Sequence, residues 1–335
     1  MAAEPILSVR GLRTHFATRD GVVRAVDGVS FDVTAGRTLG IVGESGCGKS
    51  VMTRSILRIV DPPGRIVEGS ITLRFRDGRA PVELTALRDD GPEIRAIRGK
   101  EIALIFQEPM ASFSQYYTVG DQIIEAIRLH SDLDAKQARA RAIAMLRQVG
   151  IPSAERRVDE YPFQLSGGLR QRVMIAMALA CGPRILIADE PTTALDVTTQ
   201  AQVLDLLREL RDREGLSIII ITHDMGVIAE MADDVVVMYL GRAVETGPVD
   251  AIFHDPKHPY TQALLRSIPS VDATPRSRLA TMPGAIPHPL NRPPGCPFHP
   301  RCDRAKPGLC DRDMPEAVSL GEGREVACVL YGGAA

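Results

Sequence analysis

The feature that most constrains the fold of this 335-residue chain is a glycine-rich segment that directly follows a short apolar run. Residues 38–43 read TLGIVG, and residues 43–50 read GESGCGKS. A nearly continuous apolar run of this length fits a buried strand of a parallel sheet. A glycine-rich loop that ends in GKS, immediately after such a strand, is the pattern of a phosphate-binding loop. We therefore predict a strand, this loop and then a helix from about residue 49 to residue 59.

The residue types of this loop suit the binding of ATP. Glycines allow backbone N–H groups to approach phosphates closely. Lys49 would reach the β- and γ-phosphates, and the Ser50 hydroxyl would bind Mg²⁺. Cys47 is interpreted as a small residue that the loop tolerates rather than as a redox switch. The predicted nucleotide-binding residues of the loop are Gly43, Glu44, Ser45, Gly46, Cys47, Gly48, Lys49, Ser50 and Val51.

The remaining hydrophobic pattern indicates an α/β fold. Alternating or strand-like segments near the N-terminus predict further strands at 6–12, 22–33 and 69–75. Short apolar runs predict buried strands of a parallel sheet at 101–106, 184–189 and 217–223. Between the first two of these runs, a helical pattern from about 109 to 180 predicts an inserted helical subdomain.

Polar side chains follow these buried strands at positions that suit ATP hydrolysis. Asp189 ends the run ILIAD, and its carboxylate would hold Mg²⁺ directly or through water. Glu190 follows it and is the candidate for polarising the attacking water. The amide of Gln107 would contact both Mg²⁺ and that water, and His223 would contact the γ-phosphate. The predicted catalytic residues are Lys49, Gln107, Glu190 and His223, and the predicted Mg²⁺ ligands are Ser50, Gln107 and Asp189.

A second predicted anion site lies at the start of a helix. Residues 165–168 read LSGG, and residues 169–181 have a broad apolar side typical of a buried helix. The Ser166 hydroxyl, the amides of Gly167 and Gly168 and the helix N-terminus together suit the binding of a phosphate.

Composition limits the classes of protein to which the chain can belong. Its 40 basic and 42 acidic residues are nearly balanced, so nothing indicates an extended nucleic-acid-binding surface. No apolar run approaches the roughly 20 residues that span a bilayer. The N-terminus has no basic segment followed by an apolar one, so we see no secretion signal. We expect a cytosolic protein that reaches a membrane only through a partner.

The last eighty residues have a different composition. Thirteen of the 24 prolines lie in residues 255–335, and four of the six cysteines are Cys296, Cys302, Cys310 and Cys328. In a reducing compartment such clustering favours metal binding over disulfides. The spacings C-x5-C, C-x7-C and C-x17-C lack the short knuckle of most structural zinc sites, whereas a cuboidal iron–sulfur cluster tolerates wider loops. A [4Fe–4S] cluster, zinc, and free or disulfide-linked thiols all remain alternatives. We expect His254, His258 and His299 to be loop residues rather than ligands.

With these motifs assembled, residues 1–255 resemble an ATP-binding cassette (ABC) ATPase. The motifs stand in that family's order: Phe16, GESGCGKS, Gln107, LSGGLRQR, ILIADE, TALD and His223. The resemblance implies a P-loop fold with a RecA-like parallel sheet core, an antiparallel β subdomain and the helical subdomain at about 109–180. It also implies that Phe16 stacks on adenine and that Ser166, Gly167 and Gly168 face the γ-phosphate held by an opposite subunit. Asp196, in TALD, would link the two sites.

Residues 256–335 resemble the C-terminal extension of oligopeptide- and dipeptide-importer ATPase subunits. The resemblance rests on HDPKHPYTQALLRSIP at 254–269 and on PGCPFHPRC at 294–302. In that group the four tail cysteines are associated with a [4Fe–4S] cluster, which we expect to be structural here.

This resemblance implies an ATP-hydrolysing subunit of a bacterial importer of di- or oligopeptides, peripheral on the cytoplasmic face of the inner membrane. The implied partners are two transmembrane permease subunits, a second ABC ATPase subunit that is identical or related, and an extracytoplasmic solute-binding protein. A nickel or other small-solute importer is an alternative. A soluble ABC protein or an iron–sulfur-dependent sensor that is uncoupled from transport is an alternative of another class.

Overall fold

The computed structural model describes residues 4–108, 112–193, 195–268, 282 and 284–332. The chain forms two compact units. Unit 1 comprises Met1–Glu4, Thr34–Arg37 and Leu87–Ile221, and unit 2 comprises Pro5–Val33, Thr38–Ala86 and Thr222–Ala335. Residues on both sides of the predicted domain boundary at 255 therefore belong to unit 2, and that boundary remains a prediction.

Unit 2 contains two sets of strands. In the first, β1 (Pro5–Thr18) lies between β2 (Gly21–Thr34) and β4 (Gly64–Leu73), and β4 pairs with the short β5 (Val82–Glu83). The β1–β4 and β4–β5 pairs are antiparallel, as an antiparallel β subdomain requires. Phe16, near the end of β1, pairs in register with Gly64.

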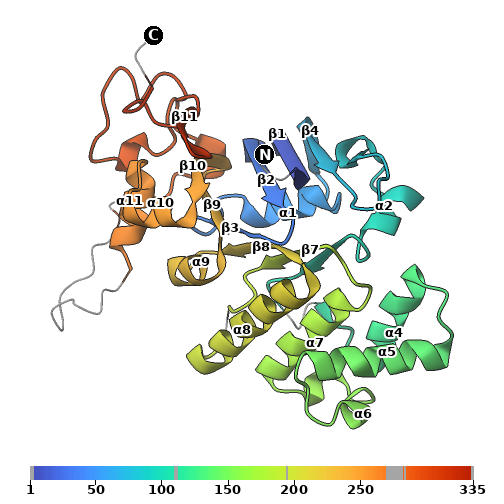
Figure 1. Ribbon diagram of the computed structural model, residues 1–335. Helices are drawn as coiled ribbons and strands as arrows, with labels where there is room; N and C mark the ends of the chain where they lie inside the picture. The colour runs from blue at the N-terminus through green and yellow to red at the C-terminus, as the bar shows by residue number, and fades with distance from the viewer. Residues whose placement is uncertain (1–3, 109–111, 194, 269–281, 283, 333–335) are drawn as a thin grey trace. The chain divides into compact units, whose positions relative to one another are not determined.

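The second set of strands in unit 2 carries the phosphate-binding segment. β3 (Thr38–Val42) is wholly buried and pairs in parallel with β9 (Asp234–Tyr239). From β9 the pairing continues antiparallel through β10 (Arg242–Pro248) and β12 (Arg324–Val326) to β11 (Val318–Gly321). In Figure 1 the C-terminal segment, drawn in orange and red, lies beside β10 and α11.

The described part of unit 2 also contains the helices α1 (Lys49–Ile56), α9 (Met225–Met231), α10 (Val249–His254) and α11 (Pro259–Arg266). Helix α1 ends three residues earlier than the predicted residue 59, because Arg58 adopts a left-handed backbone with φ 57°. Helix α11 and strands β11 and β12 show that the proline-rich tail contains more regular structure than its composition indicates.

Among the described residues of unit 1, the strands β6 (Ile102–Ile105), β7 (Ile185–Asp189) and β8 (Ser217–Thr222) pair in parallel. Every residue of β7 and β8 is buried, which explains why both strands read as continuous apolar runs. Helix α2 (Pro92–Ile97) precedes β6, and α8 (Val197–Glu214) connects β7 to β8. The α/β class predicted from the sequence is confirmed in these elements.

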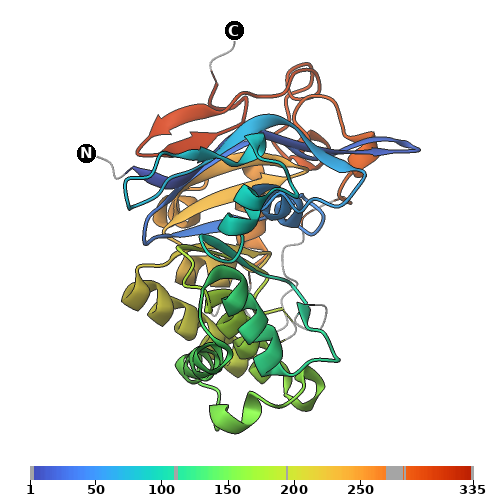
Figure 2. The same ribbon diagram turned by 90° about the vertical axis from the view of Figure 1, so that its right-hand side faces the viewer.

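The helical part of unit 1 lies between β6 and β7 in the chain. It contains α4 (Val119–His130), α5 (Ala135–Gln148), α6 (Ala154–Arg157) and α7 (Gly167–Leu179), which Figure 2 shows packed together in green. Thr118 and Asp134 begin α4 and α5 with complete capping boxes. The predicted helical segment at about 109–180 matches these helices, although residues 109–111 lie outside the described part of the chain.

Candidate active site

The predicted phosphate-binding loop lies in unit 2 between β3 and α1. Two of its glycines have no room for a side chain: a Cβ on Gly43 would lie 2.2 Å from the Met238 carbonyl oxygen, and one on Gly48 would lie 2.0 Å from the Ala25 carbonyl oxygen. Gly48 also has φ 102°, a backbone conformation that strongly favours glycine. The backbone of the loop therefore packs directly against neighbouring strands.

Lys49 lies inside this loop. Its side chain is 5 % exposed, and its ammonium donates to the carbonyl oxygens of Gly43 (2.6 Å) and Glu44 (3.2 Å). Ser50 and Val51 form the rest of the first turn of α1, whose N-terminus favours negative charge. The loop thus combines a cation, a helix N-terminus and closely packed backbone, which suits the binding of phosphates.

Cys47 is 4 % exposed, and burial raises the pKa of its thiol. A buried neutral thiol reacts poorly, which supports its interpretation as a tolerated small residue. Phe16 is half-buried: a Cβ on Gly64 would lie 2.4 Å from its ring, so part of the ring packs on the β1–β4 ladder. His223 is exposed and directly precedes Asp224, which caps α9.

The acidic pair Asp189–Glu190 lies in unit 1, where β7 ends. The two residues are 7 % and 8 % exposed. Glu190 has a left-handed backbone with φ 49°, and its N–H donates to the Ile221 carbonyl oxygen at 2.8 Å. Its carboxylate oxygen Oε2 accepts from Gln107 Nε2 at 3.0 Å and from Thr193 Oγ1 at 2.9 Å. The structure therefore brings together two residues that are 83 positions apart and that the sequence assigned to one catalytic site.

The serine–glycine segment begins α7, as predicted. Ser166 is the N-cap residue, and its hydroxyl accepts from the Leu169 N–H at 3.4 Å. Ser166 and Gly167 are exposed, and a Cβ on Gly168 would lie 2.7 Å from the Thr199 Cγ2. Thr199 in turn donates its backbone N–H and its hydroxyl to the Asp196 carboxylate, at 3.0 and 2.6 Å. Hydrogen bonds from Thr199 also lower the pKa of Asp196.

The predicted site residues thus divide between the two units. Unit 2 holds Phe16, Gly43–Val51 and His223, whereas unit 1 holds Gln107, Asp189, Glu190, Ser166–Gly168 and Asp196. Thr193 and Thr199 were not among the predicted site residues: Thr193 is the first residue of TALD, but only Asp196 of that motif was assigned a role, and Thr199 lies outside the motif. Arg301 and Tyr260 were also missed, and both contact the phosphate-binding loop.

The four tail cysteines line one small cavity in unit 2, together with His258 and Phe298. The described cysteines form no disulfide. Burial raises the pKa of Cys296 to about 11, and burial also raises the pKa values of Cys302 and Cys328. Within the described residues, no group of three or more potential ligands lies close enough to hold a metal ion. The structure therefore brings the thiols to a common cavity without itself establishing a metal site.

His258 lies, as predicted, in the connection between α10 and α11, but it is not an ordinary exposed loop residue. It caps α11, is 1 % exposed, and its Nδ1 accepts from the Tyr260 N–H at 3.0 Å. Because Nδ1 accepts, the proton of the neutral ring is on Nε2. Nε2 has no hydrogen-bond partner among the described residues. The loop prediction is wrong for His254, which is the last residue of helix α10, and for His299, which lies in a 3₁₀ turn with its Nδ1 2.9 Å from the Cys296 carbonyl oxygen.

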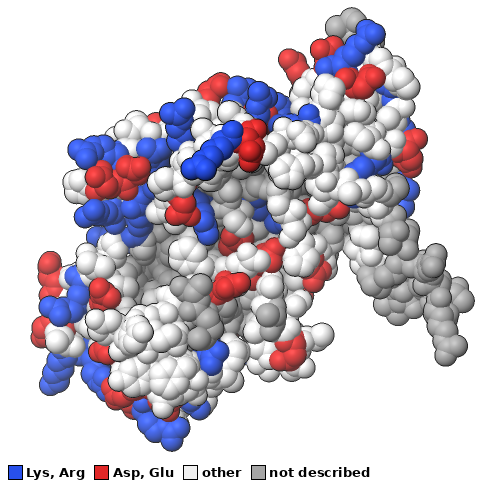
Figure 3. Space-filling model, turned by 180° about the vertical axis from the view of Figure 1, so that it is seen from behind, with Lys and Arg blue, Asp and Glu red and all other residues white. Residues whose placement is uncertain are grey.

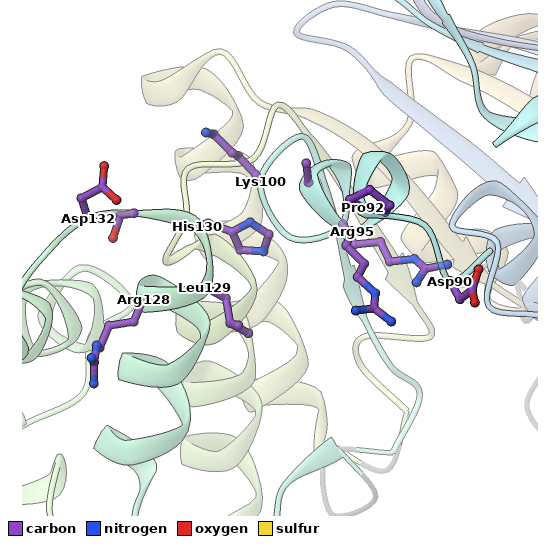
Figure 4. Close-up of a pocket in the computed structure, with 11 residues that line it drawn as sticks. Asp90, Pro92, Arg95, Lys100, Arg128, Leu129, His130 and Asp132 are labelled. Atoms are coloured by element: carbon purple, nitrogen blue, oxygen red, sulfur yellow. The ribbon is translucent and has the colours of Figure 1, made fainter. Parts of the chain in front are cut away.

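A larger cavity of about 780 Å³ lies in unit 1, between α2 and the end of α4 (Figure 4). Arg95, Lys100, Arg128 and His130 line it together with Asp90 and Asp132, and none of the predicted site residues does. On the molecular face drawn in Figure 3, basic and acidic side chains are interspersed, as on an ordinary protein surface. No helix in the described part of the chain is long and apolar enough to span a bilayer.

The loop after β3, the carboxylates that end β7 and the serine–glycine start of α7 define the class of an ABC-type ATP-binding cassette. The ABC transporter family model matches residues 26–193, and the chain belongs to this family. A second model, the C-terminal region of oligopeptide and dipeptide transporters, matches residues 244–310.

Full-length relatives and solved structures agree with this assignment. A peptide import ATP-binding protein of Brucella abortus (strain 2308) is 49 % identical over 97 % of this chain and 94 % of its own. The dipeptide transport ATP-binding protein DppD of Escherichia coli (strain K12) is 47 % identical over 96 % of each chain. The dimeric structure of the bacterial ABC transporter cassette MJ0796 matches with a TM-score of 0.62 and 26 % identity, over 72 % of this chain and 98 % of that one.

Proposed function

We propose that this chain is the ATP-hydrolysing subunit of an importer of di- or oligopeptides. The observation that carries the proposal is that one chain contains both an ABC transporter region and the C-terminal region of oligopeptide and dipeptide transporters. A nickel or other small-solute importer is the alternative within the same class, because the substrate is selected by other subunits.

The proposed reaction is Mg²⁺-dependent hydrolysis of ATP. Lys49 and the amides of the loop bind the phosphates, and Ser50, Gln107 and Asp189 hold Mg²⁺. Glu190 orients and polarises the attacking water, while the amide of Gln107, which already contacts Glu190, fixes the carboxylate. His223 contacts the γ-phosphate. Phe16 presents the exposed part of its ring to the adenine.

We further propose that two cassettes close head to tail around ATP. Ser166 and Gly167 are exposed at the N-terminus of the 13-residue helix α7, so they are available to the nucleotide of a second cassette. Asp196 is joined to this segment through Thr199 and links the two sites. The dimeric cassette MJ0796 supports this arrangement by similarity. The second cassette is either a copy of this chain or a related subunit.

The proposed membrane attachment is indirect, through two permease subunits on the cytoplasmic face of the inner membrane. Exposed aromatic side chains support this proposal: Tyr116, Tyr117, Tyr161 and Phe163 are 89, 61, 38 and 57 % exposed, and all lie in unit 1. These residues form two pairs, one before α4 and one before α7, and exposed aromatic residues are typical of protein interfaces. An extracytoplasmic solute-binding protein completes the proposed importer.

We also propose that Cys296, Cys302, Cys310 and Cys328 hold a [4Fe–4S] cluster, with zinc as the alternative. The residue types suit such a cluster, because four thiols that form no disulfide in the described structure line one cavity, although they do not lie close enough there to hold a metal ion. The buried His258 lines the same cavity, and its unpaired Nε2–H fits a group whose sulfur atoms accept a hydrogen bond. When bound, such a cluster would cross-link four segments of a small, proline-rich lobe and could exchange one electron.

Purification of the native complex tests the proposed function. The tagged chain is isolated from membranes in detergent, its partners are identified by mass spectrometry, and ATP hydrolysis is measured with and without di- and tripeptides. We expect permease subunits and stimulation by peptides together with their binding protein. Stimulation by Ni²⁺ alone would favour the alternative importer. Co-purification with ribosomes or DNA, or with no partner, would overturn the transport proposal.

A further inference from the structure

We infer that Arg301, in the C-terminal lobe (residues 284–332), is a positioning residue for ATP that acts through Glu44 of the phosphate-binding loop. All the residues involved belong to unit 2. The inference rests on the proposed binding of ATP by the loop, but not on any metal at the cysteines.

Glu44 poses an electrostatic problem for a phosphate-binding loop. It directly follows Gly43, and it carries a carboxylate on a segment that must attract the polyanionic triphosphate. Two like charges a few ångströms apart repel, and the repulsion is stronger near a protein than in bulk water. An uncompensated carboxylate at this position would therefore weaken the binding of ATP.

Arg301 compensates this charge with a two-pronged ion pair. Its Nη1 lies 2.7 Å from Glu44 Oε2, and its Nη2 lies 3.0 Å from Glu44 Oε1. The Arg301 side chain is only 4 % exposed, whereas Glu44 is 23 % exposed. Planar, bidentate pairing of this kind fixes the orientation of the carboxylate as well as its charge. Nη1 also donates to the Tyr239 hydroxyl at 3.3 Å, so the guanidinium is itself held in place.

The backbone of Glu44 is fixed at the same time. Its N–H donates to the Tyr260 hydroxyl at 2.9 Å, and its carbonyl oxygen accepts from Lys49 Nζ at 3.2 Å. Arg301 and Tyr260 therefore fix Glu44, whose carbonyl oxygen accepts a hydrogen bond from Lys49. A shift of Glu44 would move the carbonyl oxygen that accepts from Lys49, and the Lys49 ammonium would move with it.

The contacts of Arg301 and Tyr260 belong to one buried aromatic cluster. Tyr239, Tyr260 and Phe298 lie with ring centroids 4.7 to 5.3 Å apart, and each is at most 2 % exposed. The Arg301 N–H donates to the Phe298 carbonyl oxygen, and the Cys302 N–H donates to that of His299. The C-terminal lobe therefore packs on the aromatic cluster through Phe298, and this packing positions Arg301 against the phosphate-binding loop. The same lobe contains the four cysteines.

The experiment compares Arg301→Met with Arg312→Met, an exposed arginine of the same lobe, in the purified importer complex. Methionine keeps the aliphatic stem and removes the charge. For Arg301→Met we expect the KM for ATP to rise about tenfold, equivalent to about 1.4 kcal/mol, with kcat within about twofold of the native value. We expect the KM of Arg312→Met to stay within about twofold.

A double-mutant cycle separates charge compensation from general packing. In Arg301→Met/Glu44→Gln the unpaired carboxylate is gone, so we expect the KM for ATP to recover at least about threefold from that of Arg301→Met. Arg301→Lys keeps the positive charge but lacks the planar guanidinium that pairs with both carboxylate oxygens. It should give an intermediate KM for ATP, and it provides the test if the methionine variant does not fold. Independent effects of the two substitutions, or an unchanged KM in Arg301→Met, would overturn the inference. If the native complex does not bind ATP at all, the proposed function itself is refuted.

Discussion

Glu190 shows how a single residue is prepared for chemistry. A left-handed backbone costs a non-glycine residue about 1–3 kcal/mol, so the φ of 49° persists only because the surroundings impose it. The bond from its N–H to the Ile221 carbonyl oxygen fixes the backbone, and two donors fix its Oε2. The carboxylate is consequently positioned before any substrate binds, which lowers the reorganisation needed during the reaction.

Replacement of Glu190 by Gln tests this role with little change in shape. The glutamine carbonyl can still accept from Gln107 and Thr193, whereas the negative charge that polarises water is lost. We expect ATP binding within about twofold of native and a decrease in kcat of at least about 100-fold. Nucleotide binding and phosphate release measure the two effects, with Glu125→Gln on the exposed face of α4 as the matched control. Turnover close to native in Glu190→Gln would remove Glu190 from its assigned role.

At the residue scale, the sequence indicates groups whose chemistry is concentrated in a short motif. Lys49 and the glycines around it are identifiable because strand, loop and helix follow one another along the chain. The Arg301–Glu44 pair was not predictable, since 257 residues separate its partners and neither stands in a pattern that requires the other. The capping role of His258 was missed because the neighbouring prolines indicated a loop alone, whereas Pro259 occupies the first turn of α11, where proline is favoured.

At the scale of elements, Asp27 connects β2 to two other segments of unit 2. It is 4 % exposed, and its carboxylate accepts from Arg242 of β10 at 3.1 Å and from Arg292 of the C-terminal lobe at 2.8 Å. Burial acts to raise the pKa of Asp27, but these arginines outweigh it and hold the pKa below its ordinary value. Removal of the carboxylate would leave several guanidinium groups close together without a counter-charge.

We therefore expect Asp27→Asn to lower the free energy of unfolding by about 3 kcal/mol at pH 7. Because the folded-state pKa is depressed, this contribution is complete above the unfolded pKa of about 4 and disappears as the pH falls through the folded value. The difference between native protein and variant should shrink below about pH 4. Urea unfolding across this pH range measures the difference in the free energy of unfolding.

The control is Asp32→Asn, because Asp32 lies on the same strand as Asp27 but forms an exposed ion pair with Arg10 of β1. This substitution should lower the free energy of unfolding by less than about 1 kcal/mol. A constant difference down to pH 2.5 would contradict the electrostatic explanation.

Elements that are buried on both faces were the easiest to predict. β3, β7 and β8 are continuous apolar runs because parallel strands are covered on both sides. β11 and β12 were not predicted, since they have only four and three residues and most of their side chains are not buried. Such short strands carry no readable alternation, and their pairing with β10 is determined by the tertiary structure.

At the scale of the whole chain, the C-terminal lobe and the phosphate-binding loop are joined within unit 2 by the Arg301–Glu44 ion pair. Cys302→Ser removes one thiol directly beside Arg301. We expect loss of bound iron, a fall in Tm of at least about 4 °C and a higher KM for ATP. Tail composition alone predicted only the loss of stability, and the effect on ATP follows from the Arg301–Glu44 pair.

Iron analysis, the visible absorption spectrum, thermal unfolding and ATP kinetics measure these effects in Cys302→Ser. Cys181→Ser, outside the lobe, is the matched control and should keep its iron. Stoichiometric zinc instead of iron in the native protein would contradict the proposed cluster and leave the thiol site intact. Normal stability with abolished ATP hydrolysis would indicate redox control rather than a structural role.

The function of the whole molecule depends on its attachment to permeases, and the aromatic pair Tyr161–Phe163 tests where this occurs. The two rings stack with centroids 5.5 Å apart, and Arg170 of α7 fixes their backbone by donating to the carbonyl oxygens of Pro162 and Phe163. Rigid exposed aromatic residues lose little entropy on binding and often dominate an interface. We expect Tyr161→Ala/Phe163→Ala to reduce permease co-purification at least about tenfold, equivalent to about 1.4 kcal/mol, while Tm changes by less than about 2 °C. Leu129→Ala removes an apolar side chain of the same unit that is more exposed, at 73 %, and should retain the permeases. Full retention by the aromatic variant would place the docking surface elsewhere on the chain.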